Sequence, residues 1–128
     1  MNTLTITGNL TREPEVVSPK GSEYSVIKFS IANNDERHKK DTGDWESVAS
    51  FFDCEYWTKN PQHWLQQLVK GCQVCLQGKL KQERWDDKET QKQRSRVLVS
   101  VEGFPIVVQR GDSKPVQSEP DDDEQIPF

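Results

Sequence analysis

The chain has 128 residues and a mass of 14.8 kDa, which fits one domain with short tails and argues against two full domains. Hydrophobic residues make up 32% of it, no stretch approaches the roughly 18 apolar residues of a membrane span, and the first residues lack the regions of a signal peptide. With three cysteines and a net charge of −4, these features exclude a disulfide-stabilised secreted protein and predict a soluble, cytoplasmic one.

Alternating apolar residues predict two strands in the first third of the chain. In residues 4–10, leucine and isoleucine alternate with threonine, and Gly8 interrupts the pattern. A second strand is predicted over residues 24–33, with Phe29 between two isoleucines on one face. Residues 34–46 are almost wholly polar and contain Thr-Gly-Asp turn chemistry, so an extended hairpin loop is predicted there.

The third predicted strand, residues 47–57, has two distinct faces. Its even positions are mostly apolar, whereas its odd positions place Phe51 and Trp57 beside the carboxylates of Asp53 and Glu55. Because a hydrophobic core would exclude the two carboxylates, the whole odd face is predicted to be exposed.

A short helix is predicted over residues 61–70. Asn60 is a suitable N-cap, Pro61 fits the first helical position and Gly71 follows the last turn. The apolar stripe of this helix consists of Trp64, Leu65, Leu68 and Val69. The helix is therefore expected to cover one end of a β-barrel.

Two further strands are predicted over residues 73–85 and 94–103, joined by a charged hairpin tip. The residues expected to face inward are Val74, Leu76, Gly78, Leu80, Ser95, Val97, Val99 and Val101. Those expected to face outward include Lys79, Lys81, Glu83, Trp85, Arg94, Arg96, Leu98 and Ser100. Three amphipathic strands, a short helix and two more strands predict an all-β fold, the five-stranded Greek-key barrel known as the OB-fold.

The outward faces combine aromatic rings with cations. The aromatic residues are Phe51, Trp57 and Trp85, and the basic residues are Lys79, Lys81, Arg94 and Arg96. An unpaired nucleobase offers a π-face for stacking and each phosphate offers a charge for a cation, whereas a duplex hides its bases. The combination predicts a binding face for single-stranded nucleic acid. The alternative is that the aromatics belong to the core and the lysines to an ordinary solvated strand face.

Charge divides the chain into a predicted folded domain, residues 1–110, and an acidic tail, residues 111–128. The first part carries 16 lysines and arginines against 15 acidic residues, and the second carries one lysine against six. The tail ends in an acidic and then apolar tip made of Asp121, Asp122, Asp123, Glu124, Ile126, Pro127 and Phe128. A short apolar end with a terminal carboxylate suits a pocket with a basic rim, so a protein-interaction tip on a disordered tail is predicted. A purely solubilising tail is the alternative.

Several segments together resemble one known family. They are Leu4 to Leu10 with Pro14-Glu15, Phe51 to Trp57, Lys70-Gly71 to Gly78, Trp85 and the Asp-Asp-Asp…Ile-Pro-Phe tip. They resemble the bacterial single-stranded DNA-binding proteins, which are homotetrameric OB-fold proteins, over about residues 2 to 108 and the tip.

The resemblance implies base stacking by Phe51, Trp57 and Trp85, and sequence-tolerant binding and protection of single-stranded DNA in replication, recombination and repair. It also implies a homotetramer, recruitment of replication and repair proteins through the tip, association with the nucleoid, and no catalytic activity. Two departures have consequences. The position near Arg37 is not aromatic, which predicts one stacking platform fewer, and the linker from Gly111 to Ser118 is short.

Other functions are weaker alternatives. Cys72 and Cys75 have the spacing of a metal or redox pair, but strand alternation would separate their sulfurs and no second such pair exists. Asp53 and Glu55 are compatible with a metal-dependent nuclease, although no partnering base stands at a recognisable spacing. An RNA-binding OB module and a protein-interaction adaptor also remain open. No cofactor, bound metal or membrane partner is expected.

Overall fold

Seven strands and one helix follow one another along residues 1–110, the part of the chain that this computed structural model describes. The elements are β1 (Leu4–Leu10), β2 (Glu15–Val17), β3 (Ser25–His38), β4 (Trp45–Thr58), α1 (Pro61–Gln67), β5 (Gln73–Asp86), β6 (Gln93–Val101) and β7 (Ile106–Gln109). The predicted tail and tip, residues 111–128, lie outside the described residues. In the described part, no helix is long and apolar enough to cross a membrane.

The five long strands close into a barrel in the order β1-β3-β4-β6-β5, with β5 paired back to β1. The β4–β6 contact is parallel and the other pairings are antiparallel. This is the predicted OB-fold. Two short strands were not predicted: β2 extends the sheet beside β3, and β7 lies against β5. With three and four residues, they are too short to show a clear alternation.

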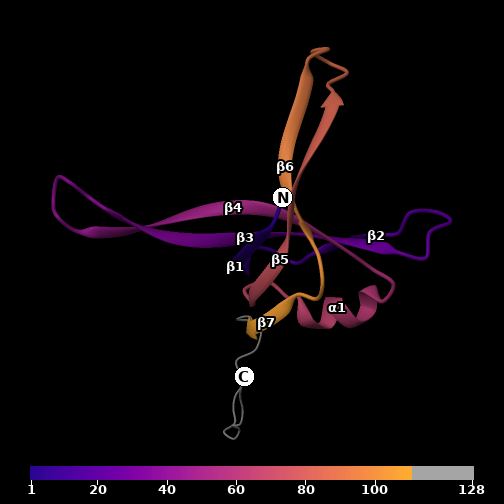
Figure 1. Cartoon of the computed structure of the whole chain (residues 1–128), viewed down its shortest axis with the longest axis horizontal. Coiled ribbons are helices and arrows are strands. Elements are labelled where there is room, and N and C mark those ends of the chain that lie inside the picture. Colours follow the sequence, from indigo (N-terminus) through magenta and orange to yellow (C-terminus); the bar gives the residue numbers. More distant parts are fainter. Residues whose placement is uncertain (111–128) are drawn as a thin grey trace, which may run out of the picture.

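The core fills the barrel with the inward residues of β3, β4, β5 and β6. Its largest fully buried members include Phe29, Ile27, Ile31, Leu76 and Leu68. Helix α1 lies at the lower end of the barrel in Figure 1, beside β7. It ends at Gln67 rather than at residue 70, and the amide of Leu68 still donates to the Trp64 carbonyl. The shorter helix turns the chain early, so that Leu68 is completely buried in the core.

Two long hairpins project from the barrel in different directions (Figure 1). The β3–β4 hairpin continues to His38 and resumes at Trp45, so the predicted loop over residues 34–46 is wrong except for its tip. At that tip Lys39 donates its amide to the Asp44 carbonyl over 2.8 Å. Both faces of the hairpin are in contact with solvent, so its strands carry polar residues without the alternation that predicts a strand.

The β5–β6 hairpin shows the same departure from a buried pattern. Leu80 and Val97 were expected to face the core but are 48% and 57% exposed, because they lie where the hairpin leaves the barrel. Leu98 was expected to be exposed and is only 1% exposed. It keeps the predicted outer side of the sheet, opposite Lys81, but it lies close enough to the barrel to be covered there.

Candidate nucleic-acid interface

The predicted DNA-binding residues all lie on one side of the sheet, which we call the aromatic face. In β4, Phe51, Glu55 and Trp57 share this side because they are separated by even numbers of residues. Glu55 is opposite Ser100 of β6, and Ser100 is opposite Lys79 of β5. Directly opposed residues project to the same side of a sheet. The same register adds Lys81, Trp85, Arg94 and Arg96 to the aromatic face.

The three aromatic residues present ring surface to solvent. Phe51 is 66% exposed, and Trp57 and Trp85 are each 45% exposed. Ordinary core side chains are almost fully covered, so the alternative that these rings belong to the core is wrong. The aromatic face therefore offers three separate platforms on which a flat ligand can stack.

Trp45 is a fourth exposed aromatic that was not predicted as a site residue. It begins β4, lies on the same side of that strand as Phe51, and is 66% exposed. Its ring is 5.1 Å from that of His38, its partner in the ladder. Arg37 is paired with Glu46, one position along the ladder, so Trp45 adds an exposed ring near Arg37 but on the other side of the hairpin. Extending the odd positions of the third predicted strand back to residue 45 would have found it.

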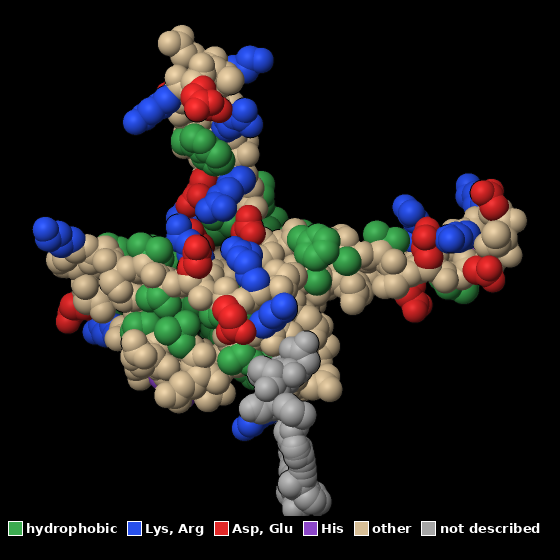
Figure 2. Space-filling model, turned by 180° about the vertical axis from the view of Figure 1, so that it is seen from behind, with side chains coloured by type: hydrophobic (Ala, Val, Ile, Leu, Met, Phe, Trp, Pro, Cys, Tyr) green, Lys and Arg blue, Asp and Glu red, His purple; other side chains and the backbone are tan. Residues whose placement is uncertain are grey.

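Acidic side chains accompany the cations of the aromatic face. Figure 2 shows basic and acidic groups mixed along the upright hairpin and down into the barrel. Arg94 pairs with Asp87 at 2.8 Å. Arg96 pairs with Glu83 at 3.0 Å and with Asp53 at 3.5 Å. A phosphate that approaches either arginine therefore competes with a carboxylate that is already in place.

The two lysines of the predicted site differ from each other. Lys79 lies 3.9 Å from Glu102, a long and exposed pair that holds the lysine weakly. Lys81 has no ion pair within residues 1–110. Lys81 is therefore the predicted cation that is most available to a phosphate.

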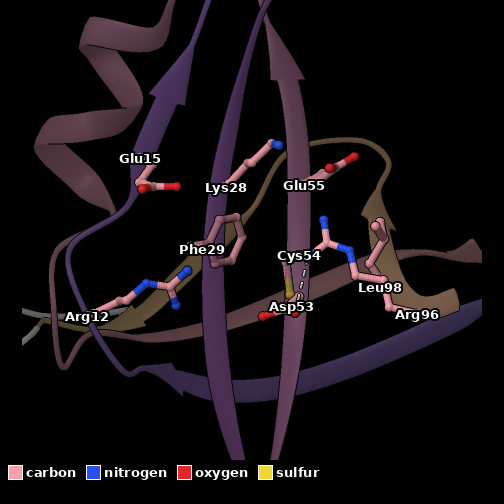
Figure 3. A pocket seen from close by; sticks show the side chains of 9 residues that line it. All are labelled: Arg12, Glu15, Lys28, Phe29, Asp53, Cys54, Glu55, Arg96 and Leu98. Atoms are coloured by element: carbon pink, nitrogen blue, oxygen red, sulfur yellow. Dashed lines mark hydrogen bonds and ion pairs between the residues drawn. The ribbon is translucent and has the colours of Figure 1, made fainter. Parts of the chain in front are cut away.

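A cavity of about 170 Å³ opens on the aromatic face, beside Asp53 and Glu55 of β4. Its charged lining comprises Arg12, Glu15, Lys28, Asp53, Glu55 and Arg96, with Phe29 and Leu98 among its apolar residues (Figure 3). Arg12 and Lys28 were not predicted as site residues. Lys28 stood on the polar face of the second predicted strand, but only the pairing of β3 with β4 brings it opposite Glu55.

Glu55 departs from the prediction that the odd face of β4 is exposed throughout. Only 6% of this residue is exposed, compared with 45% of Trp57 two positions later. Glu55 occupies the middle of the sheet, between Lys28 of β3 and Ser100 of β6. Burial of the carboxylate was not visible in the sequence because it depends on neighbours that are far apart along the chain.

The two buried cysteines, Cys54 and Cys72, offer little reactivity. Burial raises the pKa of the Cys54 thiol to about 12, and the neighbouring Asp53 carboxylate adds to the effect. Burial also raises the pKa of Cys72. Both groups are protonated thiols at neutral pH, whereas metal ligation and nucleophilic attack need the thiolate. In the described part of the chain, no three histidine, cysteine or acidic residues gather to hold a metal ion.

The sequence matches the model of the single-strand binding protein family over residues 1–106. The chain belongs to this family. Relatives named single-stranded DNA-binding protein include that of Borreliella burgdorferi, 37% identical over 83% of this chain and 69% of the relative. Another is that of Mycobacterium tuberculosis, 32% identical over 78% of this chain. The chain covers 59% of the mycobacterial protein, less than two thirds of its length.

Solved structures of family members share the fold. A Plasmodium falciparum SSB in complex with ssDNA matches with a TM-score of 0.73 over 85% of this chain and 96% of that one, at 20% identity. A deletion mutant of the single-stranded DNA binding protein from Thermus aquaticus matches with a TM-score of 0.69 over 85% of this chain and 51% of that one, at 22% identity. Both support the OB-fold of this family member.

Proposed function

We propose that this family member binds single-stranded DNA with little regard to sequence, and protects it during replication, recombination and repair in the cytoplasm. The observation that carries the proposal is the aromatic face, where exposed rings and cations occur together. Exposed rings can stack on bases, and cations can neutralise the phosphates between them. The names of the relatives agree with this proposal. Phe51, Trp57 and Trp85 are the proposed stacking residues, and Lys79, Lys81, Arg94 and Arg96 are the proposed phosphate ligands.

Titration with oligo(dT) tests the proposal. Tryptophan emission should be quenched, because bases stacked on Trp57 and Trp85 contact the fluorophores directly. Oligo(U) of equal length tests the RNA-binding alternative, and tighter binding of oligo(U) would favour it. Addition of magnesium should leave a labelled oligonucleotide intact, because the proposed role is binding without catalysis. The absence of any binding would remove the proposal and favour an adaptor built on the barrel.

The salt dependence of binding should identify the cations that contact phosphate. Neutralising one phosphate contributes about 0.7 to the slope of log K against log salt for single strands. Lys81→Ala should flatten the slope by about that amount, because this lysine is free of ion pairs in the described residues. Arg94→Ala should flatten it less, because Arg94 already pairs with Asp87. Equal slopes for wild type and Lys81→Ala would place the DNA path elsewhere.

We also propose a homotetramer. Leu80, Val97 and Phe52 are exposed on the side of the sheet opposite to the aromatic face, and further copies of the chain would cover them without blocking the rings. Sedimentation should then give about four times the 14.8 kDa mass of the chain. A single species of monomer mass would contradict the tetramer.

The tip is proposed to recruit replication and repair proteins. Its residues lie outside the described part of the chain, so this proposal rests on the sequence alone. Phe128→Ala should weaken partner binding, because it removes the apolar anchor beside the terminal carboxylate. Removal of residues 119–128 should leave affinity for DNA unchanged or slightly higher at low salt, because the tail carries negative charge. A peptide of residues 119–128, titrated against replisome and repair proteins, measures the first effect. If the Phe128→Ala peptide bound partners as tightly as the wild-type peptide, the recruitment role would be contradicted and the tip would only solubilise the protein.

A further inference from the structure

Glu55 is a buried carboxylate without a partner. Only 6% of the residue is exposed, and its carboxylate forms no hydrogen bond or ion pair with any side chain among residues 1–110. Asp53 lines the same cavity but has Arg96 at 3.5 Å. A buried polar group normally has a partner, because an unsatisfied one costs free energy. Glu55 therefore has a free acceptor in the wall of a cavity that is open to ligand.

The cavity has room for a flat ring. Its volume of about 170 Å³ is roughly ten times the space that one buried water needs. Along β4, Glu55 lies two residues from Trp57 and four from Phe51. Because a strand rises by about 3.3 Å per residue, a DNA strand that follows β4 from one ring to the other passes close to Glu55, which lies in the wall of the cavity. A base between the two stacked ones can thus turn its edge toward Glu55.

The charges around the cavity decide which base edge fits. The Glu55 carboxylate is a hydrogen-bond acceptor, whereas the side chains of Lys28, opposite it in the ladder, and Arg96 are donors, and all three line the cavity (Figure 3). The edge of cytosine presents an amino donor beside two acceptors, and a carboxylate that accepts from the cytosine amino group is an established pairing in base recognition. Thymine has the same ring shape but presents carbonyl oxygen where cytosine has the amino group. That oxygen would face the carboxylate of Glu55.

We propose that Glu55 makes this cavity a base-reading subsite that accepts cytosine and disfavours thymine. The proposal rests on the proposed function, since it places the subsite on the same DNA path. It adds a limited base preference to a face that is otherwise tolerant of sequence. The preference belongs to one position on that path, whereas stacking on the aromatic rings accepts any base.

The test compares the affinities of oligo(dC) and oligo(dT) of equal length, in mildly alkaline buffer that keeps cytosine neutral. The two homopolymers also differ in stacking and flexibility, so the readout is the change in their affinity ratio between wild type and Glu55→Gln. The glutamine amide keeps the shape of glutamate but can donate to a thymine carbonyl. The ratio should shift toward oligo(dT) by at least about fivefold.

Asp53→Asn is the matched control. It removes one negative charge from the same cavity and the same strand, but from a side chain that is already paired with Arg96. This variant should change both affinities by the same factor and leave their ratio as in wild type. A shift of the ratio in Asp53→Asn, with none in Glu55→Gln, would overturn the proposal.

A second measurement uses wild-type protein alone, so that it does not depend on folding of a variant. Oligo(dT) strands in which a single thymine is replaced by 5-methylcytosine keep the methyl group and leave the stacking and flexibility of the rest of the strand unchanged. They should bind more tightly than the thymine originals. Equal affinities, or an unchanged ratio in a folded Glu55→Gln variant, would reject the subsite while leaving DNA binding in place. Failure of the wild type to bind any oligonucleotide would instead remove the proposed function itself.

Discussion

Alanine at Trp57 or at Trp85 is expected to weaken binding of oligo(dT) by about 1–3 kcal/mol, because each change removes one stacking platform. The two residues lie on β4 and β5, which are not paired to each other, so the double variant should lose about the sum of the two effects. Competition with a labelled oligonucleotide measures this loss without relying on tryptophan emission.

Trp64→Phe is the matched control for these two variants. Trp64 lies in α1 at the end of the barrel, where its ring stacks at 6.1 Å on Phe104, and it is not part of the aromatic face. Its replacement should change emission and leave affinity as in wild type. Circular dichroism of all variants must agree with that of wild type. Wild-type affinity in folded Trp57→Ala and Trp85→Ala variants would contradict the stacking assignment.

Gly78→Ala is expected to be the most destabilising single methyl addition in the described chain. A Cβ at this position would lie 2.1 Å from the carbonyl oxygen of Ser100, which belongs to the backbone of β6 and cannot rotate away. Gly78 of β5 is paired with Val101 of β6 on one side and with Leu4 of β1 on the other, so the clash would act where the barrel closes. The free energy of unfolding should fall by about 3 kcal/mol or more, measured by urea denaturation.

Gly43→Ala separates this clash from the general cost of losing a glycine. Gly43 has a φ of +77° and lies at the tip of the β3–β4 hairpin, where an added Cβ meets nothing within 4 Å. The left-handed backbone conformation is then the only cost of alanine at this position, and it lowers the free energy of unfolding by about 1–2 kcal/mol. A Gly78→Ala variant no less stable than Gly43→Ala would show that the strands can separate at Ser100 without loss.

The barrel was predictable because its strands are half buried, and half burial leaves a period of two in the sequence. The alternation around Phe29 shows this period, and so do the odd positions of β4, which placed Phe51 and Trp57 on the correct side. Strand parity is a local property, so the aromatic face could be read from single segments. The outer part of the β3–β4 hairpin was not predictable, because with solvent on both faces it carries no alternation.

The charged part of the site depends on contacts between distant segments. Arg96 is a predicted DNA-binding residue, and the structure pairs it with Asp53, which is 43 residues away in the chain. The burial of Glu55 likewise depends on the register of β4 with β3 and β6. Composition and spacing cannot supply that register. The sequence therefore predicts that the rings and the cations share one face, but not that carboxylates pair with some of those cations.

The closure of the barrel by β1 and β5 also determines how the chain folds. Leu4 pairs with Gly78, so the first strand finds its partner only after more than half of the chain has been synthesised. At about 5–20 residues per second, several seconds pass on the ribosome before that contact can form. The β3–β4 hairpin needs only neighbouring residues and can form earlier. Pairing of β1 with β5 joins residues that are farther apart in the chain than those of any other pairing in the barrel, so it is expected to be a slow step of folding, and until it forms the nascent sheet has an open edge.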